Sequence, residues 1–260
     1  MGERPAGRPW HARARLDHFC IVTWALEPAR LAQALPAGLR PQTFEVGGRE
    51  CSLASAVAFV DQDFHFRGCP PARITCAQIN YRAYVRRTDL SGVFFLRTIL
   101  GSRWAIVPRR LWSMPWVHEP VEVRGRWDGP DLRALDVEAP GAVGRTSIHL
   151  EGQVVPDVPS ALLSPEVADP ALGWFARRDG RLGHYSVWHA PLELHAARVV
   201  SASAGPFEDA GLVDPDQAPL AALVQRSVEF DVHLPPGIDG ALYQGGGLLM
   251  GHSPGLGRIG

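Results

Sequence analysis

Proline and glycine interrupt this sequence so often that long helices are not expected. The 260 residues include 23 prolines and 27 glycines. Proline removes a backbone donor and disrupts a helix interior, and glycine loses more conformational entropy than any other residue when it is ordered. The chain is therefore expected to fold from short elements.

Short runs rich in β-branched and aromatic residues lie between these interruptions. They predict strands at residues 18–24, 51–60, 74–87, 91–100, 117–127, 146–155, 182–189, 192–201 and 227–234. Helix signals are fewer, and they predict helices at 27–35, 102–113 and 216–225, with a short helical turn at 169–176. Many short strands at close spacing are typical of a barrel or a sandwich, so the expected fold class is mainly β with a few helices (α+β).

The strands are expected to form a single domain over residues 15–236. Four arginines stand at positions 4, 8, 13 and 15, and the apolar stretch of a signal peptide is lacking, so residues 1–14 are predicted to be a flexible basic arm. Residues 237–260 hold too many glycines to fill a core and are predicted to be a Gly-rich tail. Because no run approaches 18 apolar residues, we expect a cytoplasmic protein without a membrane span.

The charge balance gives no reason to expect a nucleic-acid partner, because the formal net charge is −1. The four cysteines, at positions 20, 51, 69 and 76, form no Cys-x-x-Cys pair and are expected to be free thiols. No phosphate-binding loop, dinucleotide fingerprint, nucleophile elbow or metal-ligand cluster is found, so no cofactor and no metal are expected. A homo-oligomer is left open.

The 260 residues contain no lysine, because all 26 Lys and Arg positions are arginine. Arginine stays protonated and does not form an imine, whereas a desolvated lysine can become a nucleophile. Schiff-base catalysis by a side chain of this chain is therefore excluded.

The expected strand at 74–87 has a row of polar side chains on one face, since side chains alternate between the two faces of a strand. One face carries Gln78, Asn80, Arg82 and Tyr84, and the other carries Ile79, Tyr81, Ala83 and Val85. Two interpretations remain open. Either the polar face is solvated, as in many antiparallel sheets, or it lines a pocket in which Arg82 binds an oxyanion while Gln78 and Asn80 orient the ligand.

The motif NYRAYV at residues 80–85, followed by GVFFL at 92–96, resembles the YqjF-like family of the acetoacetate decarboxylase-like superfamily. Weaker matches follow in order at residues 34–39, 114–116, 181–192 and 227–236, so the resemblance covers residues 15–236. It implies a bent antiparallel sheet that closes into a cone-like β-barrel, with helices outside and a ligand pocket inside.

Two departures from the relatives concern chemistry. The family usually has glutamate where Gln78 stands, and glutamine keeps the shape of that side chain but loses its charge. Acetoacetate decarboxylase carries its Schiff-base lysine directly after Gly-Phe-Pro. The comparable position here is Trp116, which suits a wall or a stacking platform. Decarboxylation through an imine is therefore not expected.

The remaining candidates for acid–base catalysis are Tyr84, His184 and His189, because a tyrosine or histidine in a pocket can donate or accept a proton. The two histidines lie on opposite faces of the strand at 182–189, and the sequence leaves open which face lines a pocket. The candidate substrate-binding residues are Gln78, Asn80, Arg82, Trp116 and Trp188.

These residues lead to two hypotheses. The first is an enzyme of lyase or cyclase type that acts on a partly apolar carbonyl or carboxylate compound by enolisation, dehydration, aldol-type cleavage or cyclisation. The second is a non-catalytic ligand-binding or sensing protein of the same fold, which the missing lysine and the uncharged Gln78 favour.

Overall fold

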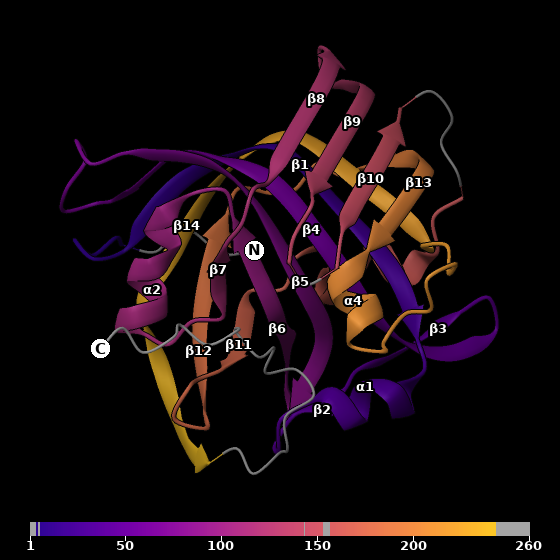
Figure 1. Cartoon of the computed structure of the whole chain (residues 1–260), viewed down its shortest axis with the longest axis horizontal. Coiled ribbons are helices and arrows are strands. Elements are labelled where there is room, and N and C mark those ends of the chain that lie inside the picture. The colour runs from indigo at the N-terminus through magenta and orange to yellow at the C-terminus, as the bar shows by residue number, and fades with distance from the viewer. Residues whose placement is uncertain (1–3, 5, 143, 153–156, 243–260) are drawn as a thin grey trace.

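The computed structural model of the chain describes residue 4 and residues 6–142, 144–152 and 157–242 (Figure 1). The strands of this part are β1 (Ala12–Leu26), β2 (Arg40–Pro41), β3 (Thr43–Val46), β4 (Arg49–Phe66), β5 (Ile74–Arg87), β6 (Leu90–Leu100), β7 (Trp116–His118), β8 (Glu122–Asp128), β9 (Asp131–Ala139), β10 (Thr146–Glu151), β11 (Leu172–Ala176), β12 (Arg181–His189), β13 (His195–Ala204) and β14 (Ala221–Leu242). The predicted mainly β class is confirmed.

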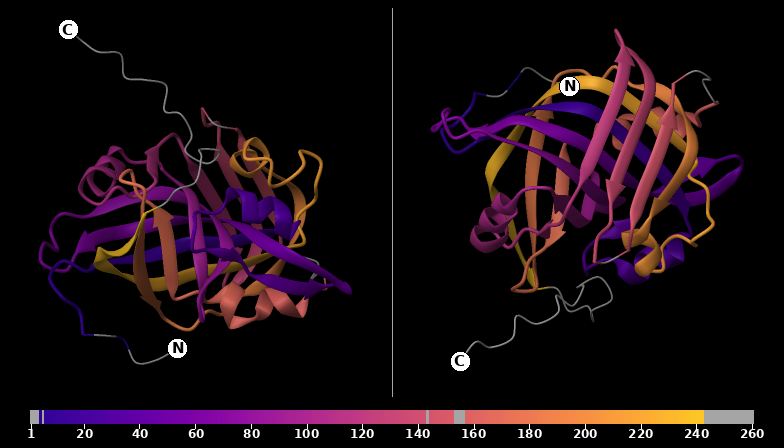
Figure 2. Two further views of the ribbon diagram at one scale, coloured as in Figure 1. Left: turned by 90° about the horizontal axis from the view of Figure 1, so that it is seen from below. Right: turned by 45° about the horizontal axis from the view of Figure 1, so that its top comes forward.

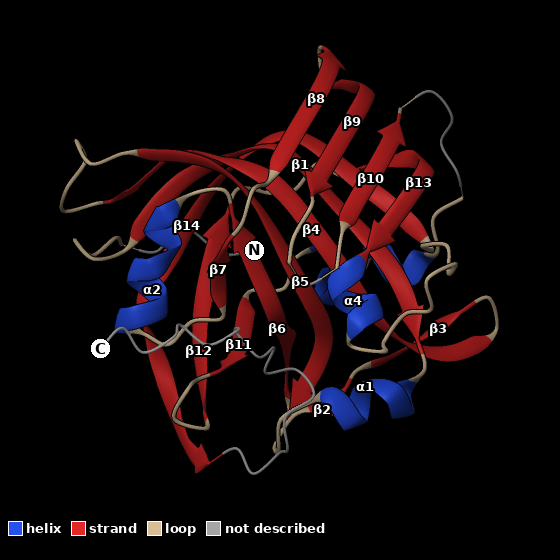
Figure 3. Ribbon diagram, viewed as in Figure 1, coloured by secondary structure: helices blue, strands red, loops and turns tan. Residues whose placement is uncertain are grey.

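The helices are short and lie at the periphery of the sheet (Figure 3). They are α1 (Pro28–Ala34), α2 (Ile106–Leu111), α3 (Pro165–Ala168) and α4 (Gly205–Asp209), with 3₁₀ turns at Arg103–Ala105 and Ser160–Leu163. Proline stands in the first turn of α1, α3 and α4, where its missing N–H costs nothing.

Seven strands close into a barrel, in the order β1, β4, β5, β6, β11, β12 and β14. The ring closes because β14 pairs with β1 on one side and with β12 on the other. Neighbours in the ring are antiparallel except β6 and β11, which run parallel. The barrel predicted from the resemblance is thus confirmed. Each of its strands has one face toward the barrel interior and one face toward the outside.

A second group of strands covers part of the outside. The first residues of β14 also pair with β13, and the sheet continues through β10 and β9 to β8 (Figure 1; Figure 2, right). This extension packs against the outward faces of β1, β4 and β5 in one large apolar core. Tyr81 of β5 joins the two layers, since its hydroxyl lies 2.7 Å from Oγ1 of Thr146 in β10.

Residues Phe19–Trp24 of β1 are buried without a break because that stretch has one face toward the barrel interior and the other toward the second layer. Phe207 of α4 closes the end of the outer core. Its ring meets those of Trp24 and Tyr81 edge to face, at centroid distances of 5.8 and 5.5 Å.

Four of the predicted elements need correction. The helix predicted at 216–225 is wrong, because its apolar residues 221–224 begin β14 and pair with both β1 and β13. The helical turn at 169–176 is wrong as well, because residues 172–176 form β11 between β6 and β12. The strand at 117–127 is divided by Pro120 into β7 and β8, and β13 begins at His195 rather than at 192. The helices predicted at 27–35 and 102–113 are present as α1 and α2.

Two strands extend beyond residues 15–236. Strand β1 begins at Ala12, inside the expected arm, and β14 continues to Leu242. Arg4 of the predicted arm and Arg13 of β1 form ion pairs with Asp231, because the arm and β1 both lie against β14. The glycine-rich stretch from residue 243 onward lies outside the described residues.

Candidate functional site

The polar face of β5 points into the barrel. Gln78, Asn80 and Arg82 line an interior cavity with a volume of about 90 Å³, which is room for several water molecules or a compact ligand. The alternate residues Ile79 and Tyr81 face the outer core instead. Of the two interpretations of this strand, the structure therefore shows the pocket.

The remaining wall of the cavity is mostly apolar. It includes Leu16, Phe19, Phe59, Val93, Phe95, Val187, Val228 and Phe230 from five strands, together with Trp116 of β7. Apolar walls strengthen every electrostatic interaction inside a cavity, because little water is present to screen it. The few polar groups that face this cavity therefore determine what it can bind.

Gln78 and Asn80 form a small hydrogen-bonded row. The carbonyl oxygen of Asn80 accepts from Nε2 of Gln78 at 2.9 Å and from Oγ1 of Thr98 in β6 at 2.8 Å. These two donors fix the orientation of the Asn80 amide. Its nitrogen has no hydrogen-bond partner among the described residues and is available as a donor toward a ligand.

Arg82 carries the positive charge of the cavity. Its Nη2 donates to the hydroxyl of Tyr84 at 3.2 Å and to the carbonyl oxygen of Val167 at 3.3 Å. Its Nε is buried without a partner, and in the described part of the chain Arg82 forms no ion pair. A guanidinium that is buried without a carboxylate favours an anionic or strongly polarised oxygen atom as its ligand.

Asp61 of β4 is the cavity residue that the sequence did not single out. Its side chain faces the cavity with only 8% of the residue exposed, and burial raises the pKa of its carboxyl group to about 7. No hydrogen bond to its carboxyl group is found within the described residues. The signal was present but weak, since Asp61 continues the inward alternation of Val57 and Phe59.

Cys76 is the cross-strand neighbour of Asp61 on β5. Burial and the nearby Asp61 carboxylate raise the pKa of the Cys76 thiol to about 12. This thiol therefore stays protonated near neutral pH and is not a candidate nucleophile.

Strand β12 contributes two further polar groups to the interior. The Tyr185 ring stacks on Phe95 with 5.4 Å between centroids, and burial raises the pKa of its phenol above the usual value. The imidazole of His189, a residue only 4% exposed, lies with Nδ1 2.8 Å from the carbonyl oxygen of Ala190 and Nε2 2.9 Å from Oδ1 of Asp169. The backbone contact at Nδ1 fixes the orientation of the ring, and the side chain of Asp169 lies beside Nε2.

The structure separates the other candidates from this cavity. His184 and Trp188 lie on the outward face of β12, and Trp188 stacks under the Arg4 guanidinium at 4.6 Å. Tyr84 points inward but lies beside the cavity rather than on its lining. Its hydroxyl, 2.9 Å from Oγ of Ser55, also donates to Val167 at 3.1 Å, so it is already fully engaged.

No group of three or more His, Cys, Asp or Glu side chains in the described residues is arranged to hold a metal ion. None of the helices described is long and apolar enough to cross a membrane.

Comparison with solved structures identifies the fold. An acetoacetate decarboxylase-like enzyme from Sphingomonas wittichii RW1 aligns with a TM-score of 0.60 and 14% identity, over 91% of this chain and 94% of that one. The enduracididine biosynthesis enzyme MppR in complex with pyruvate aligns with a TM-score of 0.60 and 13% identity, over 90% and 91%. Acetoacetate decarboxylase from Legionella pneumophila aligns at 0.58 and 13%, over 91% and 89%.

No curated protein sequence matches the chain. A family of uncharacterized conserved proteins, DUF2071 (COG2071), matches residues 13–228, which run from β1 into the first part of β14. The chain belongs to the DUF2071 family and has the fold of acetoacetate decarboxylase-like proteins.

Proposed function

We propose that this protein is an enzyme that binds a compact carbonyl or carboxylate compound in the barrel cavity and acts on it by acid–base chemistry. The single observation that carries the proposal is Arg82, which lines a small, mostly apolar cavity, has a buried Nε without a hydrogen-bond partner and forms no ion pair in the described part of the chain. A ligand oxygen that accepts from Nε of Arg82 and from the Asn80 amide would satisfy both groups.

Asp61 is the acid–base group that this hypothesis favours. A carboxyl group with a pKa of about 7 is present in both protonation states near neutral pH, which is the condition for efficient proton transfer. In an enolisation, Arg82 would stabilise the enolate oxygen, while Asp61, six residues away along the β4–β5 register, would take up the proton through water in the cavity. Tyr185 and His189, which also line the cavity, are further candidate donors for dehydration, aldol-type cleavage or cyclisation.

The structural neighbours support the same class of ligand. One MppR structure contains pyruvate, and another contains the condensation product of pyruvate and imidazole 4-carboxaldehyde. Identities of 13% support no more than a shared fold, so the ligand class comes to this chain as a proposal.

The chemistry proposed does not use an imine. A Schiff-base mechanism needs a lysine, and the sequence contains none. Trp116 stands near the position that the resemblance assigns to that lysine, and its indole is part of the cavity wall. Polarisation of the substrate carbonyl is therefore assigned to hydrogen bonding by Arg82.

Calorimetric titration with pyruvate tests the binding step. Arg82→Ala is expected to weaken pyruvate binding at least about tenfold, because the ligand loses its charged donor. Arg86→Ala on the same strand is the matched control, because Arg86 is exposed outside the cavity and is expected to change nothing. Equal affinity of the Arg82→Ala variant and the wild type, with the fold intact, contradicts the proposal.

The alternative is a ligand-binding or sensing protein without turnover. The specific feature in its favour is Gln78, an uncharged amide where the relatives carry glutamate. Exchange of the methyl protons of pyruvate with deuterated water, followed by proton NMR, separates the two functions. Exchange that is faster than in buffer and lost in Asp61→Asn supports the enzyme. Binding without exchange supports the sensor.

A further inference from the structure

A second hollow lies on the outside of the barrel, beyond β12. Its volume is about 460 Å³, and Tyr185 contributes to both this hollow and the interior cavity. The hollow is lined by the segment before β1 and by β12 and β14, through Arg8, Trp10, His11, His184, Ser186 and His233. None of these six side chains is used by the proposed function.

Strand alternation explains why so many polar groups gather there. On β14, Phe230 and Val232 line the interior cavity, so the intervening Asp231 and the following His233 face outward. On β12, Tyr185 faces inward and Ser186 faces outward. The second layer of strands does not cover this part of the wall, and the segment before β1 crosses it instead.

Three side chains form a connected group in the hollow. The His11 and His233 rings lie 4.9 Å apart between centroids, and Nδ1 of His233 lies 2.9 Å from Oγ of Ser186. The His11 ring itself forms no hydrogen bond within the described residues. Both imidazoles thus keep nitrogen atoms that can bind a ligand in the hollow.

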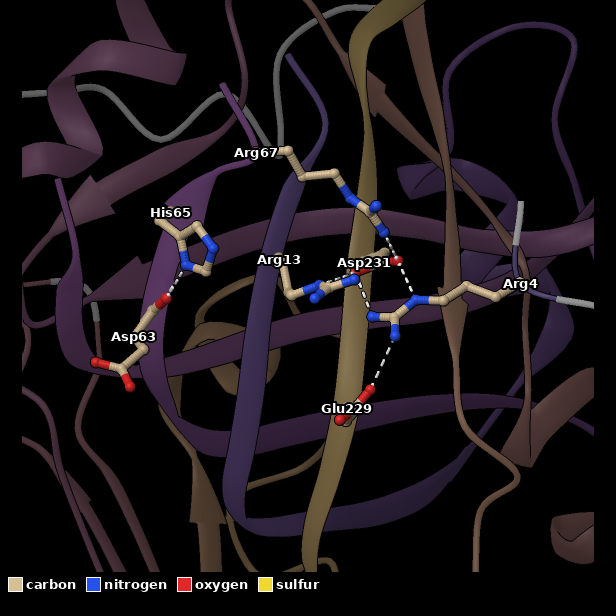
Figure 4. A network of polar contacts seen from close by, with 7 residues as sticks. All are labelled: Arg4, Arg13, Asp63, His65, Arg67, Glu229 and Asp231. Carbon is tan, nitrogen blue, oxygen red and sulfur yellow. Dashed lines mark hydrogen bonds and ion pairs between the residues drawn. The ribbon is translucent and has the colours of Figure 1, made fainter. Parts of the chain in front are cut away.

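The charged side chains next to the hollow carry a net positive charge. Asp231 is nearly fully buried and contacts three guanidinium groups, those of Arg4 at 2.8 Å, Arg67 at 2.7 Å and Arg13 at 3.5 Å (Figure 4). Arg4 also reaches Glu229 at 3.0 Å. Burial alone would raise the pKa of Asp231, but hydrogen bonds from Arg4 and Arg67 outweigh it and lower this pKa. The carboxylate is fully compensated and does not repel an anion.

Arg8 adds a further charge inside the hollow. It forms no ion pair in the described part of the chain, and its guanidinium lies 5.6 Å from the centroid of the Trp10 ring. Trp10 is 47% exposed, which is a large exposed fraction for an indole side chain. An aromatic face beside an uncompensated guanidinium suits a ligand that is both planar and anionic.

We propose that this outer hollow is a binding site for an organic anion that carries a phosphate group on a planar ring. The phosphate would accept from Arg8 and from the His11 and His233 imidazoles, and the ring would stack on Trp10. A carboxylate has the same chemistry with less charge and is expected to bind more weakly. This site is independent of the ligand proposed for the interior cavity.

Binding at this site is expected to tighten as the pH falls. Burial lowers the pKa of both His11 and His233. Repulsion from His233, Arg8 and Arg67 lowers the pKa of His11 further. The Asp231 carboxylate opposes the lowering of both pKa values. Both rings are therefore neutral near pH 7 in the free protein. A bound anion favours their protonated forms, so affinity rises as the pH drops below about 6.5.

Calorimetric titration with phenyl phosphate at pH 5.5 and 7.5 tests the proposal, with benzoate as the weaker anion and benzyl alcohol as the neutral control. A phosphate monoester loses its second charge at about pH 6, whereas benzoate stays ionised at both pH values, so benzoate reports the histidine effect and is expected to bind wild type more tightly at pH 5.5. Arg8→Ala and His233→Asn are expected to weaken binding at least about tenfold. Arg82→Ala, which alters only the interior cavity, is expected to leave it unchanged. Arg8 is exposed, so its loss does not threaten the fold.

Three results overturn the proposal. The first is no saturable binding of phenyl phosphate by wild type at either pH. The second is loss of binding in Arg82→Ala with retention in the Arg8 and His233 variants, which assigns the anion to the interior cavity. The third is equal affinity in all variants, which shows binding elsewhere on the arginine-rich surface. A negative result for phenyl phosphate does not affect the pyruvate experiment, because that experiment depends only on the effect of Arg82→Ala on pyruvate affinity.

Discussion

Arg82 and Tyr84, two residues apart on β5, converge on a single backbone oxygen. The carbonyl oxygen of Val167 lies 3.3 Å from Nη2 of Arg82 and 3.1 Å from Oη of Tyr84, and the same two atoms lie 3.2 Å from each other. The three groups tie α3 to the barrel wall beside the cavity. Tyr84 is thereby assigned the role of holding Arg82 in place, and the proton transfer proposed from sequence is given to Asp61.

Tyr84→Phe tests this assignment. The change removes a hydroxyl with partners in Arg82, Val167 and Ser55, so it is expected to lower the free energy of unfolding by about 1–2 kcal/mol in urea denaturation. Pyruvate affinity is expected to fall much less than in Arg82→Ala. If pyruvate binding is lost while stability is unchanged, Tyr84 acts on the ligand directly.

Asp61→Asn is expected to stabilise the protein in a pH-dependent way. The folded-state pKa of Asp61, about 7, lies above its ordinary value of 3.8, so the folded state holds the proton more tightly than the unfolded state. Wild type therefore loses stability as the pH rises from about 4 to 7. The variant avoids this loss and is expected to gain about 2–4 kcal/mol over wild type at pH 8, with little difference at pH 4.

Asp231→Asn is the matched control, because its pKa shift has the opposite sign. The pKa of Asp231 is lowered in the folded state, so its carboxylate contributes stability that is present above the unfolded pKa and lost as the pH falls. The Asp231→Asn variant is expected to be less stable than wild type at pH 7. Thermal unfolding at pH 4, 6 and 8 measures both variants, and identical pH profiles for wild type and Asp61→Asn refute a raised pKa for Asp61.

Gly92→Ala is expected to disturb the contact between β6 and β11. A Cβ atom at Gly92 would lie 2.4 Å from the carbonyl oxygen of Leu172, and that backbone cannot move without breaking the parallel pairing. The expected loss of stability is about 1–3 kcal/mol. Gly101→Ala is the control, because the nearest atom to its Cβ would lie 3.5 Å away. Equal stability of the two variants contradicts this close approach.

Borohydride reduction in the presence of pyruvate is expected to leave every side chain of the protein unmodified. The sequence offers no lysine amine, so peptide mapping by mass spectrometry should find an adduct only at the N-terminal amine. Trp116→Lys places an amine at the cavity wall and is the positive control. A reduced adduct on any internal peptide of the wild type shows that an imine forms without lysine and refutes the proposed chemistry.

The faces of β5 and β12 could be predicted from the sequence because alternation is a local property of a strand. It grouped Gln78, Asn80 and Arg82 together and separated His184 from His189. It could not say which group lay inside. That choice depends on how β12 and β14 meet when the ring closes, and this contact joins residues far apart along the chain.

The wrong helices have the same physical origin. Residues 221–224 and 172–176 pack against different apolar clusters on their two faces, so they are apolar on both faces and show no alternation. A short apolar run of this kind fits a helix or a buried strand equally well. Local start signals such as Asp216 and Pro219 then favoured the helix, and pairing with neighbouring strands decided against it.

The sequence by itself determined that the chain is mainly β, that β5 carries a polar row, and that no lysine is present to form an imine, because composition and alternation are local. Only the tertiary structure decided that Asp61 meets the Arg82 cavity, that His184 lies outside it, and that three arginines converge on Asp231. The pKa of Asp61 is set by desolvation, and desolvation exists only after the barrel has closed around it.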